Sequence, residues 1–530
     1  MESCNSNKQI KLLYIGCAVL CILSTLIPIW SVDILPFTDY PVHLALIQAS
    51  GFSFNTPETV TEQFQTKWFT PYSTTFLLAR LLSIAFSVET TGKILLMLYL
   101  VTTPLLFMRT LRLLGKPGYL AFPMFLMLYN FNLSWGFLPF LIAVPLMIET
   151  LNRSILCRIN PGLTNILMAC MFFTLLFFTH IFALFAALCC YLFLLLHALI
   201  QNRKIIPPML LPVVPAVFLA LLWRITLVPT ESDMFFLDKG VRFAPLSLKV
   251  RFFPDYVISG DPGWNSRIIF AFMAIIVLLR FLPLARKQTK DAPAEHQKLN
   301  KTTENSVSLS TVCVGLAAVM WLLYLTSPYS WLTAVWLFNR LAFLATAFVL
   351  VLPPMQSRFP SVVYVTGITV LCVTLMWHTA VRHQAFAEES SSGLEMMTII
   401  PPEKSLRFVS FDAGSAYTDH RPYTHFGQYY QLRHNGLVHN PFAVLSHIPV
   451  QYTPNIKTKK AGFRPEPTIV NGQLQVDLAH DRHDFYLFRL GASHTPNVIA
   501  GLFKQHMSVL PEFIGSHDQW VLFSKTESDL

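Results

Sequence analysis

The chain has 530 residues, of which 53% are hydrophobic and only 13% are charged. Water-soluble domains carry about 25% charged residues, so a soluble surface of ordinary composition is excluded and lipid must surround much of this chain. The formal net charge of +10 does not indicate a nucleic-acid partner, because the basic residues cluster in short loops between apolar segments and form no basic-aromatic groove.

The first apolar segment, Leu12–Trp30, follows Lys8 and Lys11. A continuous apolar run of about 20 residues is long enough to cross a bilayer as a helix. A secretory signal peptide would end at a small-residue cleavage site, and no such pattern precedes Ser31. We therefore expect a retained first span with a cytoplasmic N-terminus, which places the following residues outside.

The next apolar stretch, Tyr72–Val88, is short and contains Arg80. If it spans the membrane, the basic loop around Arg109 and every later basic loop fall outside. If it lies on the membrane surface and the second span is about Thr91–Phe107, all of these loops are cytoplasmic, as the positive-inside rule expects. We therefore interpret Tyr72–Val88 as a non-spanning juxtamembrane helix.

Further spans are expected wherever a long apolar run is bounded by polar or basic loops. They are about Tyr119–Phe131, Trp135–Thr150, Leu163–Thr179, Phe182–Leu199, Pro208–Leu227, Ile268–Leu284, Val307–Leu325, Trp331–Leu352 and Ser361–Trp377. The expected fold is an all-α polytopic membrane bundle of about eleven transmembrane helices. An odd number of crossings places the C-terminus outside.

The C-terminal part differs in composition from the rest. Strand-like runs occur at Leu406–Phe411, Leu474–Leu478, Asp484–Leu490 and Trp520–Phe523. Asn471-Gly472 predicts a turn, and Pro496–Val509 is expected to form a helix. We expect a transmembrane domain over residues 1–379, with long outside loops at 31–72 and 228–267, and a small extracytoplasmic α/β domain over 380–530.

The most unusual stretch, SVDILPFTDYPVHLALIQAS, follows the first span at residues 31–50. It places Asp33, Asp39 and His43 at the membrane surface, ahead of a segment that can lie along the surface as an amphipathic helix. A carboxylate here can act as a general base on a hydroxyl acceptor. A structural role is also open, because an Asp shortly before a Pro is a common helix cap.

The string Asp39-Tyr40-Pro41-Val42-His43-Leu44-Ala45 resembles a motif of bacterial multispanning proteins. Together with the layout of the first 380 or so residues, it is similar to the GT-C superfamily of membrane glycosyltransferases. The resemblance implies a polyprenyl-phosphate sugar donor, an extracytoplasmic glycan, lipid or protein acceptor, and a multi-pass location, in a bacterial inner membrane. It also implies an essential acidic residue after the first span, for which Asp39 and Asp33 compete. Superfamily members often carry a second acidic residue beside the first, where this chain has Tyr40.

Such a reaction releases the donor phosphate as an anion, which cations or a metal must stabilise. Candidates in the second long loop are Arg242, Lys249 and Arg251. Arg340 lies in or near the tenth expected span, where a charge is costly, and its guanidinium can bind phosphate or extend to the interface. His180 can contact a sugar or phosphate, or bond to a neighbouring helix.

A divalent metal is possible but no ligand set can be chosen, because Asp233, Asp238, Asp255 and Asp261 share one loop and no spacing selects among them. The chain from His378 onward holds twelve of the sixteen histidines. Within it, residues 423–436 (YTHFGQYYQLRHNG) combine aromatic and hydrogen-bonding side chains, a pattern that suits either a carbohydrate-binding surface or ordinary packing.

The sequence therefore predicts a membrane glycosyltransferase that moves a sugar from a polyprenyl-phosphate donor to an extracytoplasmic acceptor. Two alternatives remain open: a transporter or flippase of a lipid-linked or small solute, and a non-catalytic anchoring or assembly protein. Transporters often show internal repeats, and none is evident here. The sequence contains no P-loop, G-x-G-x-x-G, G-x-S-x-G or HExxH element, so ATP-driven transport and standard hydrolase chemistry lack support.

Overall fold

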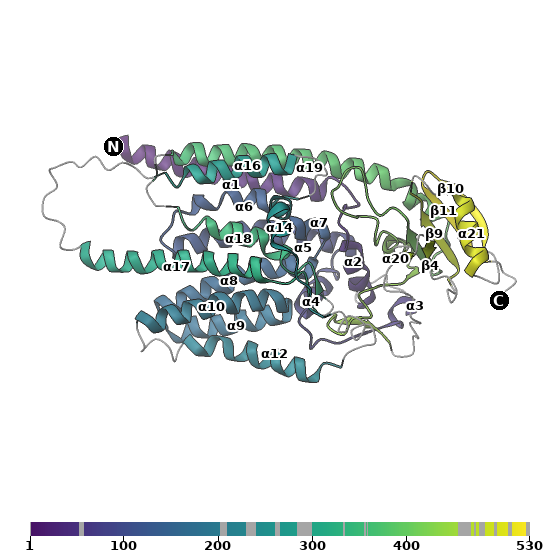
Figure 1. The fold of residues 1–530 in the computed structure, drawn as a ribbon, viewed down its shortest axis with the longest axis horizontal. Coiled ribbons are helices and arrows are strands. Elements are labelled where there is room, and N and C mark those ends of the chain that lie inside the picture. The colour runs from purple at the N-terminus through teal and green to yellow at the C-terminus, as the bar shows by residue number, and fades with distance from the viewer. Residues whose placement is uncertain are drawn as a thin grey trace.

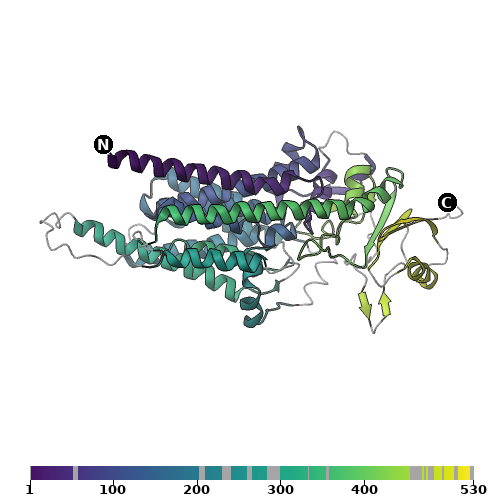
Figure 2. The same ribbon diagram turned by 90° about the horizontal axis from the view of Figure 1, so that it is seen from above.

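Long helices lie side by side along one axis, and a β-sheet lies beyond one end of them (Figures 1 and 2). The computed structural model describes residues 2–51, 58–201, 209–228, 240–259, 265–282, 299–331, 334–353, 357, 359–453, 468–470, 473–475, 483–491, 495–506 and 511–525. The short helices α2 (Tyr40–Ala49) and α4 (Ser73–Leu82) lie between the long helices and the sheet.

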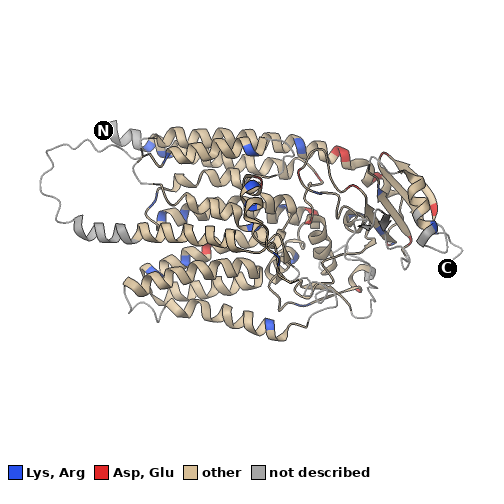
Figure 3. Cartoon of the chain, in the orientation of Figure 1, with Lys and Arg blue, Asp and Glu red and all other residues tan. Residues whose placement is uncertain are grey.

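In the described ranges, six helices are long and apolar enough to cross a membrane. They are α1 (Glu2–Trp30), α5 (Val88–Leu113), α8 (Leu138–Ile159), α10 (Ile181–Gln201), α17 (Leu299–Thr326) and α19 (Ser361–Thr398). Most of their length carries no charged residue (Figure 3). The chain is therefore an integral multi-pass membrane protein, as its composition predicts.

Shorter apolar helices occupy most of the other runs that are expected to span. They are α9 (Leu163–Thr179), η3 (Leu211–Val213) with α12 (Val214–Thr226), α16 (Asn265–Leu279) and α18 (Ala342–Val349). Helix α4, at ten residues, is about 15 Å long, half the thickness of the hydrocarbon core. This helix lies within the expected surface segment at residues 72–88, whose place at the membrane surface stays a prediction.

Two of the expected spans are not single helices. Residues 119–131 form η1 (Gly118–Ala121) and α6 (Pro123–Met127), and the chain then turns into α7 (Phe131–Trp135). The stretch 331–352 begins in a hairpin of β2 (Ser330–Trp331) and β3 (Ala334–Val335), followed by η5 (Asn339–Leu341) and α18. Both stretches are apolar throughout, so their composition does not predict these breaks.

A mixed five-stranded sheet forms the C-terminal region, with strand order β10-β11-β9-β4-β5. The strands are β4 (Ser405–Ser410), β5 (Leu437–Val438), β9 (Phe485–Arg489), β10 (Glu512–His517) and β11 (Trp520–Ser524). Strand β4 runs parallel to β5 and β9, and the remaining pairs are antiparallel.

Alternate residues of the sheet enter two separate cores, because side chains in a strand point to opposite faces. On one face Val409, Phe488 and Phe523 pack with Phe503 of α21 (Pro496–His506). On the other face Leu406, Leu487 and Trp520 pack with α20 (Gln428–His434) and the end of α19. The expected strands at 406–411, 484–490 and 520–523 are confirmed, and so is the expected helix at 496–509 as far as His506, after which residues 507–510 lie outside the described ranges.

Residues 474 and 475 of the expected strand at 474–478 belong to β8 (Gln473–Gln475), which pairs with β7 (Thr468–Val470) apart from the five-stranded sheet. Residues 476–478 and the expected turn, Asn471-Gly472, lie outside the described residues.

Helix α19 joins the long helices to the sheet. It runs unbroken from Ser361 to Thr398, so the expected domain boundary at residues 379 and 380 falls inside it. Near its end, Gly393 lies against the Trp520 ring, where a Cβ atom would come within 2.5 Å of the indole. A second connection runs from Gln431 of α20, whose Nε2 donates to the Ala45 carbonyl of α2 at 2.9 Å. The sheet region is thereby packed onto the helix that follows Asp39.

Candidate functional site

Asp39 lies at the first turn of α2, directly after the chain leaves α1. Its backbone N–H donates to the Trp135 carbonyl at 2.8 Å, and its carbonyl accepts from the His43 N–H at 3.2 Å. The side chain makes no capping hydrogen bond, although Asp39 occupies the N-cap position. Only 8% of the residue is exposed. The carboxylate is therefore buried but is not used to begin the helix.

The short helix α7 fixes the backbone on both sides of this site. Its C-terminal Gly136 has φ +72°, and a Cβ atom there would lie 2.6 Å from the Tyr40 nitrogen. Glycine is therefore required both for the left-handed turn and for the close approach. The Asn132 side chain donates to the Arg340 carbonyl at 3.4 Å. The short helix α7 therefore bonds to the backbone of both Asp39 and Arg340.

Burial controls the protonation of the Asp39 carboxyl group, which lies outside the long helices. Removal from water raises its pKa to about 7, and the positive charge of Arg340 offsets part of that increase. The His425 Nε2 lies 3.5 Å from Oδ1, beyond an ordinary direct hydrogen bond. At neutral pH this carboxyl group is therefore present in both its protonated and its ionised form.

Two histidines beside Asp39 are neutral at physiological pH. Burial lowers the pKa of His43 to about 3, with His425 and Arg340 adding to the effect. Burial also lowers the pKa of His425 to about 4. Within the described part of the chain, the His43 Nδ1 has no hydrogen-bond partner. Among the residues that the structure describes, Arg340 supplies the fixed positive charge that acts on the Asp39 carboxyl group.

Arg340 from η5 meets His180, which ends α9. The Arg340 Nη1 lies 3.2 Å from the His180 Nε2, and the guanidinium lies 4.1 Å from the centre of the Phe137 ring. Arginine has only donors, so the His180 Nε2 accepts and its ring proton lies on Nδ1. In the described residues, neither the His180 Nδ1 nor the Arg340 Nε has a partner. Buried N–H groups without acceptors favour the binding of an anion.

Aromatic side chains and histidines from distant segments complete the surroundings. Tyr72, just before α4, contacts the rings of His180 at 4.9 Å and His447 at 5.3 Å. Phe442 contacts His43 at 5.3 Å and His425 at 6.1 Å. Sequence reasoning did not assign Tyr72, His425, Phe442 or His447 to the site. The available signal was the concentration of histidines after residue 378.

Lys249 does not lie free for phosphate, contrary to the expectation. It is 2% exposed, and its Nζ donates to the carbonyls of Leu325 and Ser327 at 2.7 and 2.8 Å. These carbonyls are at the C-terminal end of α17, where a helix leaves carbonyl oxygens unpaired. The ammonium group therefore caps this helix and stabilises its dipole.

The other candidate residues are not drawn into the cluster around Asp39. Asp33 is exposed and interacts electrostatically with Lys93. Arg251 is exposed at the end of α14 (Leu246–Arg251), beside the Phe252 ring. Arg242 is also exposed, and its backbone pairs with Ser330 at the edge of the β2–β3 hairpin. Arg242 thus borders the hairpin whose Val335 carbonyl accepts from Arg340 at 3.4 Å.

The described ranges contain no group of three or more His, Cys, Asp or Glu side chains placed to hold a metal ion. Asp255 forms a two-bond ion pair with Arg267, at 2.8 and 2.6 Å. Asp233, Asp238 and Asp261, the other carboxylates considered for a metal, lie outside the described residues. The residues brought together at this site are therefore a carboxylate, an arginine and neutral histidines.

Comparison with known proteins provides no family assignment: no protein-family model and no curated protein matches this chain.

Proposed function

We propose that the chain is a GT-C-type membrane glycosyltransferase, which moves a sugar from a polyprenyl-phosphate donor to a hydroxyl acceptor on the extracytoplasmic side. One observation carries this proposal. Asp39 is buried directly after the first span, its carboxylate does not cap α2, and burial raises its pKa to about 7. A general base works best when its pKa lies near the working pH.

The Asp39 carboxylate accepts the proton of the acceptor hydroxyl group as that oxygen attacks the anomeric carbon. The new glycosidic C–O bond forms while the bond from the anomeric carbon to the phosphate oxygen breaks. The leaving lipid phosphate takes the electron pair, and the proton remains on Asp39. The site therefore needs a base on one side of the sugar and a group that binds an anion on the other.

Arg340 and His180 are suited to receive the leaving phosphate. A guanidinium can donate two parallel hydrogen bonds to a phosphate, and the His180 Nδ1–H adds a neutral donor. Both donors are fixed before reaction by Phe137, Tyr72 and the Asn132 bond to the Arg340 carbonyl. Donors that are held in place stabilise charge without further rearrangement.

In this proposal the shorter apolar helices are further crossings, and the basic loops face the cytoplasm. Contacts of basic residues with neighbouring loops and helix ends support the placement of these loops at one end of the bundle. The Lys116 Nζ donates to the Pro353 carbonyl at 2.9 Å, and the Arg158 Nη2 lies 2.9 Å from the His197 Nδ1 and 3.0 Å from the Gln201 Oε1. The positive-inside rule then puts Asp39, at the opposite end of α1, on the outside.

The test is incubation of the purified, lipid-reconstituted protein with a panel of polyprenyl-phosphate sugars. The expected result is release of free lipid phosphate with at least one donor, faster when a hydroxyl acceptor is present. Failure to release lipid phosphate from any donor, by protein that remains folded, would contradict the proposal.

A further inference from the structure

His425 brings a side chain of the C-terminal region beside the Asp39 carboxylate. Its Nε2 lies 3.5 Å from Oδ1, and the two side chains are only 10% and 12% exposed. An N–H···O hydrogen bond spans about 2.7–3.2 Å, so a movement of about 0.3 Å closes this contact. Hydrogen bonds between groups of a reaction site are often long in the free enzyme and shorten when substrate binds.

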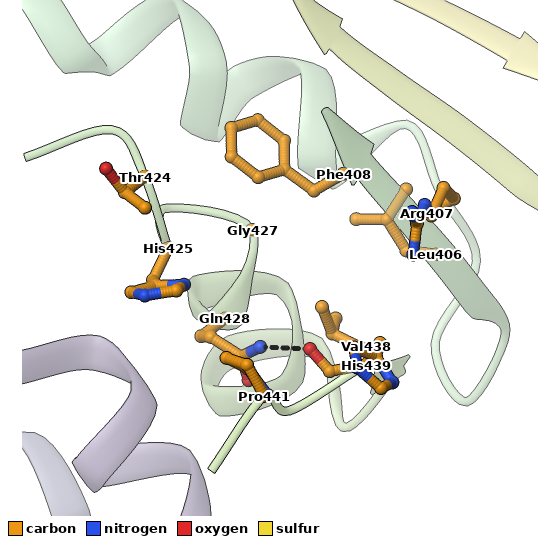
Figure 4. A pocket seen from close by; sticks show the side chains of 10 residues that line it. All are labelled: Leu406, Arg407, Phe408, Thr424, His425, Gly427, Gln428, Val438, His439 and Pro441. Carbon is orange, nitrogen blue, oxygen red and sulfur yellow. Dashed lines mark hydrogen bonds between the residues drawn. The ribbon is translucent and has the colours of Figure 1, made fainter. Parts of the chain in front are cut away.

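The segment that carries His425 is fixed in the fold. Its neighbours Tyr423 and Phe426 are fully buried in the core on one face of the sheet. Two residues after Phe426, the Gln428 Nε2 donates to the His439 carbonyl at 2.8 Å, the bond drawn as a dashed line in Figure 4. The imidazole therefore projects from a backbone that is anchored on both sides.

Helix α2, which begins beside the carboxylate, is bonded to the same region. The Asn440 Nδ2 donates to the Val42 carbonyl at 3.2 Å, and the Gln431 Nε2 donates to the Ala45 carbonyl at 2.9 Å. Both amide side chains are almost completely buried. The separation between the carboxylate and the imidazole is therefore set by two packed elements and not by an exposed loop.

His425 also lines a small hollow between β4 and the segment 424–428 (Figure 4). The hollow has a volume of about 30 Å³, enough for one or two water molecules and far below the size of a small-ligand pocket. A neutral imidazole has one N–H donor and one acceptor nitrogen. If the N–H is directed to the carboxylate, water can supply a donor to the other nitrogen.

The groups that act on the Asp39 carboxyl group leave a role for a neutral donor. Burial raises its pKa, and the charge of Arg340 on η5 lowers it. His43 on α2 and His425 are both neutral, because burial lowers the pKa of each. A hydrogen bond to the ionised form of a carboxyl group favours that form, so an imidazole N–H would act in the same direction as Arg340.

We infer that the C-terminal region completes the reaction site through His425, whose Nε2–H binds the Asp39 Oδ1, favours the ionised carboxylate and leaves Oδ2 for the proton of the acceptor. The inference rests on the proposed function. It gives His425 a positioning role, because the imidazole acts on the acceptor only through Asp39. The C-terminal region is then part of the reaction site and not only an attached domain.

The test is the pH dependence of kcat in the full, lipid-reconstituted chain. His425→Phe keeps a ring beside Phe442 and removes the donor. Loss of a hydrogen bond to a charged group should raise the midpoint, near pH 7 in the wild type, by about one pH unit or more. The ionised fraction at pH 7 then falls from about one half to about one tenth, so kcat should fall about fivefold. The KM for the donor should not change, and activity should largely recover at pH 9.

Two amide variants separate the hydrogen bond from packing. The amide nitrogen of His425→Gln can take the place of the imidazole Nε2, so this variant should keep the midpoint of the wild type. The shorter side chain of His425→Asn does not reach Asp39 and should shift the midpoint as His425→Phe does. An equal shift in the Gln and Asn variants would overturn the inference.

His439→Phe is the matched control. His439 lines the same hollow, but its ring stacks on Tyr452 at 6.0 Å, and it is not among the groups that act on the Asp39 carboxyl group. It should leave the midpoint unchanged. An unchanged or lowered midpoint in His425→Phe and His425→Asn, or the same increase in His439→Phe, would refute the role of His425.

A titration that needs no turnover separates this result from a failure of the proposed function. The infrared band of the protonated Asp39 carboxyl group is identified as the one lost in Asp39→Asn and is followed against pH. Its midpoint should rise in His425→Phe and His425→Asn but not in His425→Gln. That pattern without any release of lipid phosphate would refute the transferase and retain the contact, whereas release with an unshifted band would retain the transferase and refute the contact.

Discussion

At the scale of single residues, the arrangement around Asp39 is distinguished by which polar groups have partners. The ion pair of Asp255 with Arg267 and the capping of α17 by Lys249 use their charges within the fold. In contrast, the buried Asp39 carboxylate does not cap its helix, and the buried Arg340 Nε has no hydrogen-bond partner among the described residues. Such groups reduce stability unless a ligand compensates for them, which is typical of functional sites.

The pH dependence of sugar transfer is expected to follow Asp39. Only the ionised carboxyl group can accept a proton, so the rate should rise with pH and reach half of its maximum near pH 7. The check is kcat measured from pH 5 to pH 9 with saturating donor. A flat profile through pH 7 would show that this carboxyl group does not act as the base.

Stability should change in the opposite sense. The folded-state pKa of Asp39 is raised above its unfolded value, so folding favours the protonated form. This stabilisation is present below the unfolded pKa and is lost as pH rises through about 7. Asp39→Asn should therefore stabilise the protein by about 2–4 kcal/mol at pH 8 and much less at pH 4. Thermal unfolding at the two pH values measures this difference, and equal melting temperatures of variant and wild type at pH 8 would contradict it.

Lys249→Met is expected to destabilise the fold by about 1–3 kcal/mol, because it removes the ammonium group that bonds the terminal carbonyls of α17. The exposed Arg251→Met, two residues away, should have little effect. Thermal unfolding of both variants provides the measurement, and a loss of donor binding without a change in stability would restore Lys249 as a phosphate ligand.

At the scale of elements, α7 matters more than its five residues suggest. The Trp135 carbonyl of α7 accepts a hydrogen bond from the Asp39 N–H, and the Asn132 side chain of α7 donates one to the Arg340 carbonyl. These bonds connect the turn after α1 with η5, which are some three hundred residues apart in sequence. The relative position of base and cation therefore depends on this short helix.

Gly136→Ala should lower kcat about tenfold or more, because the new methyl group would lie 2.6 Å from the Tyr40 nitrogen and displace the turn that holds Asp39. Gly240→Ala is the matched control. Gly240 also has a left-handed backbone, φ +63°, but a Cβ atom there would meet no atom of the described residues within 4 Å. Similar activity losses in both variants would indicate general backbone strain rather than misplacement of Asp39.

Several elements were predictable from the sequence because their signals are local. Long apolar runs predict α1, α5 and α19, and alternation of apolar residues predicts β4, β9 and β11. The division of residues 119–131 into η1 and α6 and the hairpin at Ser330 were missed, because apolar composition continues through both stretches. His425 was missed as a neighbour of Asp39 because their contact joins segments almost four hundred residues apart. The bonds of Lys249 to carbonyls at the end of α17 were also missed, because no sequence pattern predicts which backbone carbonyls a lysine contacts.

At the scale of the whole molecule, the site lies where the bundle meets the C-terminal region. Asp39 and His43 come from the segment after the first span, Arg340 and His180 from later helix ends, and His425 from the sheet region. A non-catalytic anchor would not require this convergence of buried polar groups. A transporter could bind a lipid-linked sugar with the same polar groups but would leave the sugar–phosphate bond intact. Release of lipid phosphate therefore distinguishes a transferase from a transporter.

The orientation in the membrane is a further prediction. With the basic loops in the cytoplasm, the C-terminal sheet and Asp39 face the extracytoplasmic side. Alkaline phosphatase fused after Leu530 should be active in intact cells, and a green fluorescent protein fused at the same place should be dark. The reverse pattern would put the site in the cytoplasm and exclude an extracytoplasmic acceptor.

The most direct test of the account compares Asp39→Asn with Asp33→Asn in the transfer assay, using the best donor of the polyprenyl-phosphate panel. The two carboxylates are six residues apart, but Asp33 is exposed and only Asp39 is buried beside His425 and Arg340. Asp39→Asn should lose nearly all lipid-phosphate release while remaining folded, and Asp33→Asn should keep it. Undiminished release by Asp39→Asn would contradict the mechanism proposed for this chain.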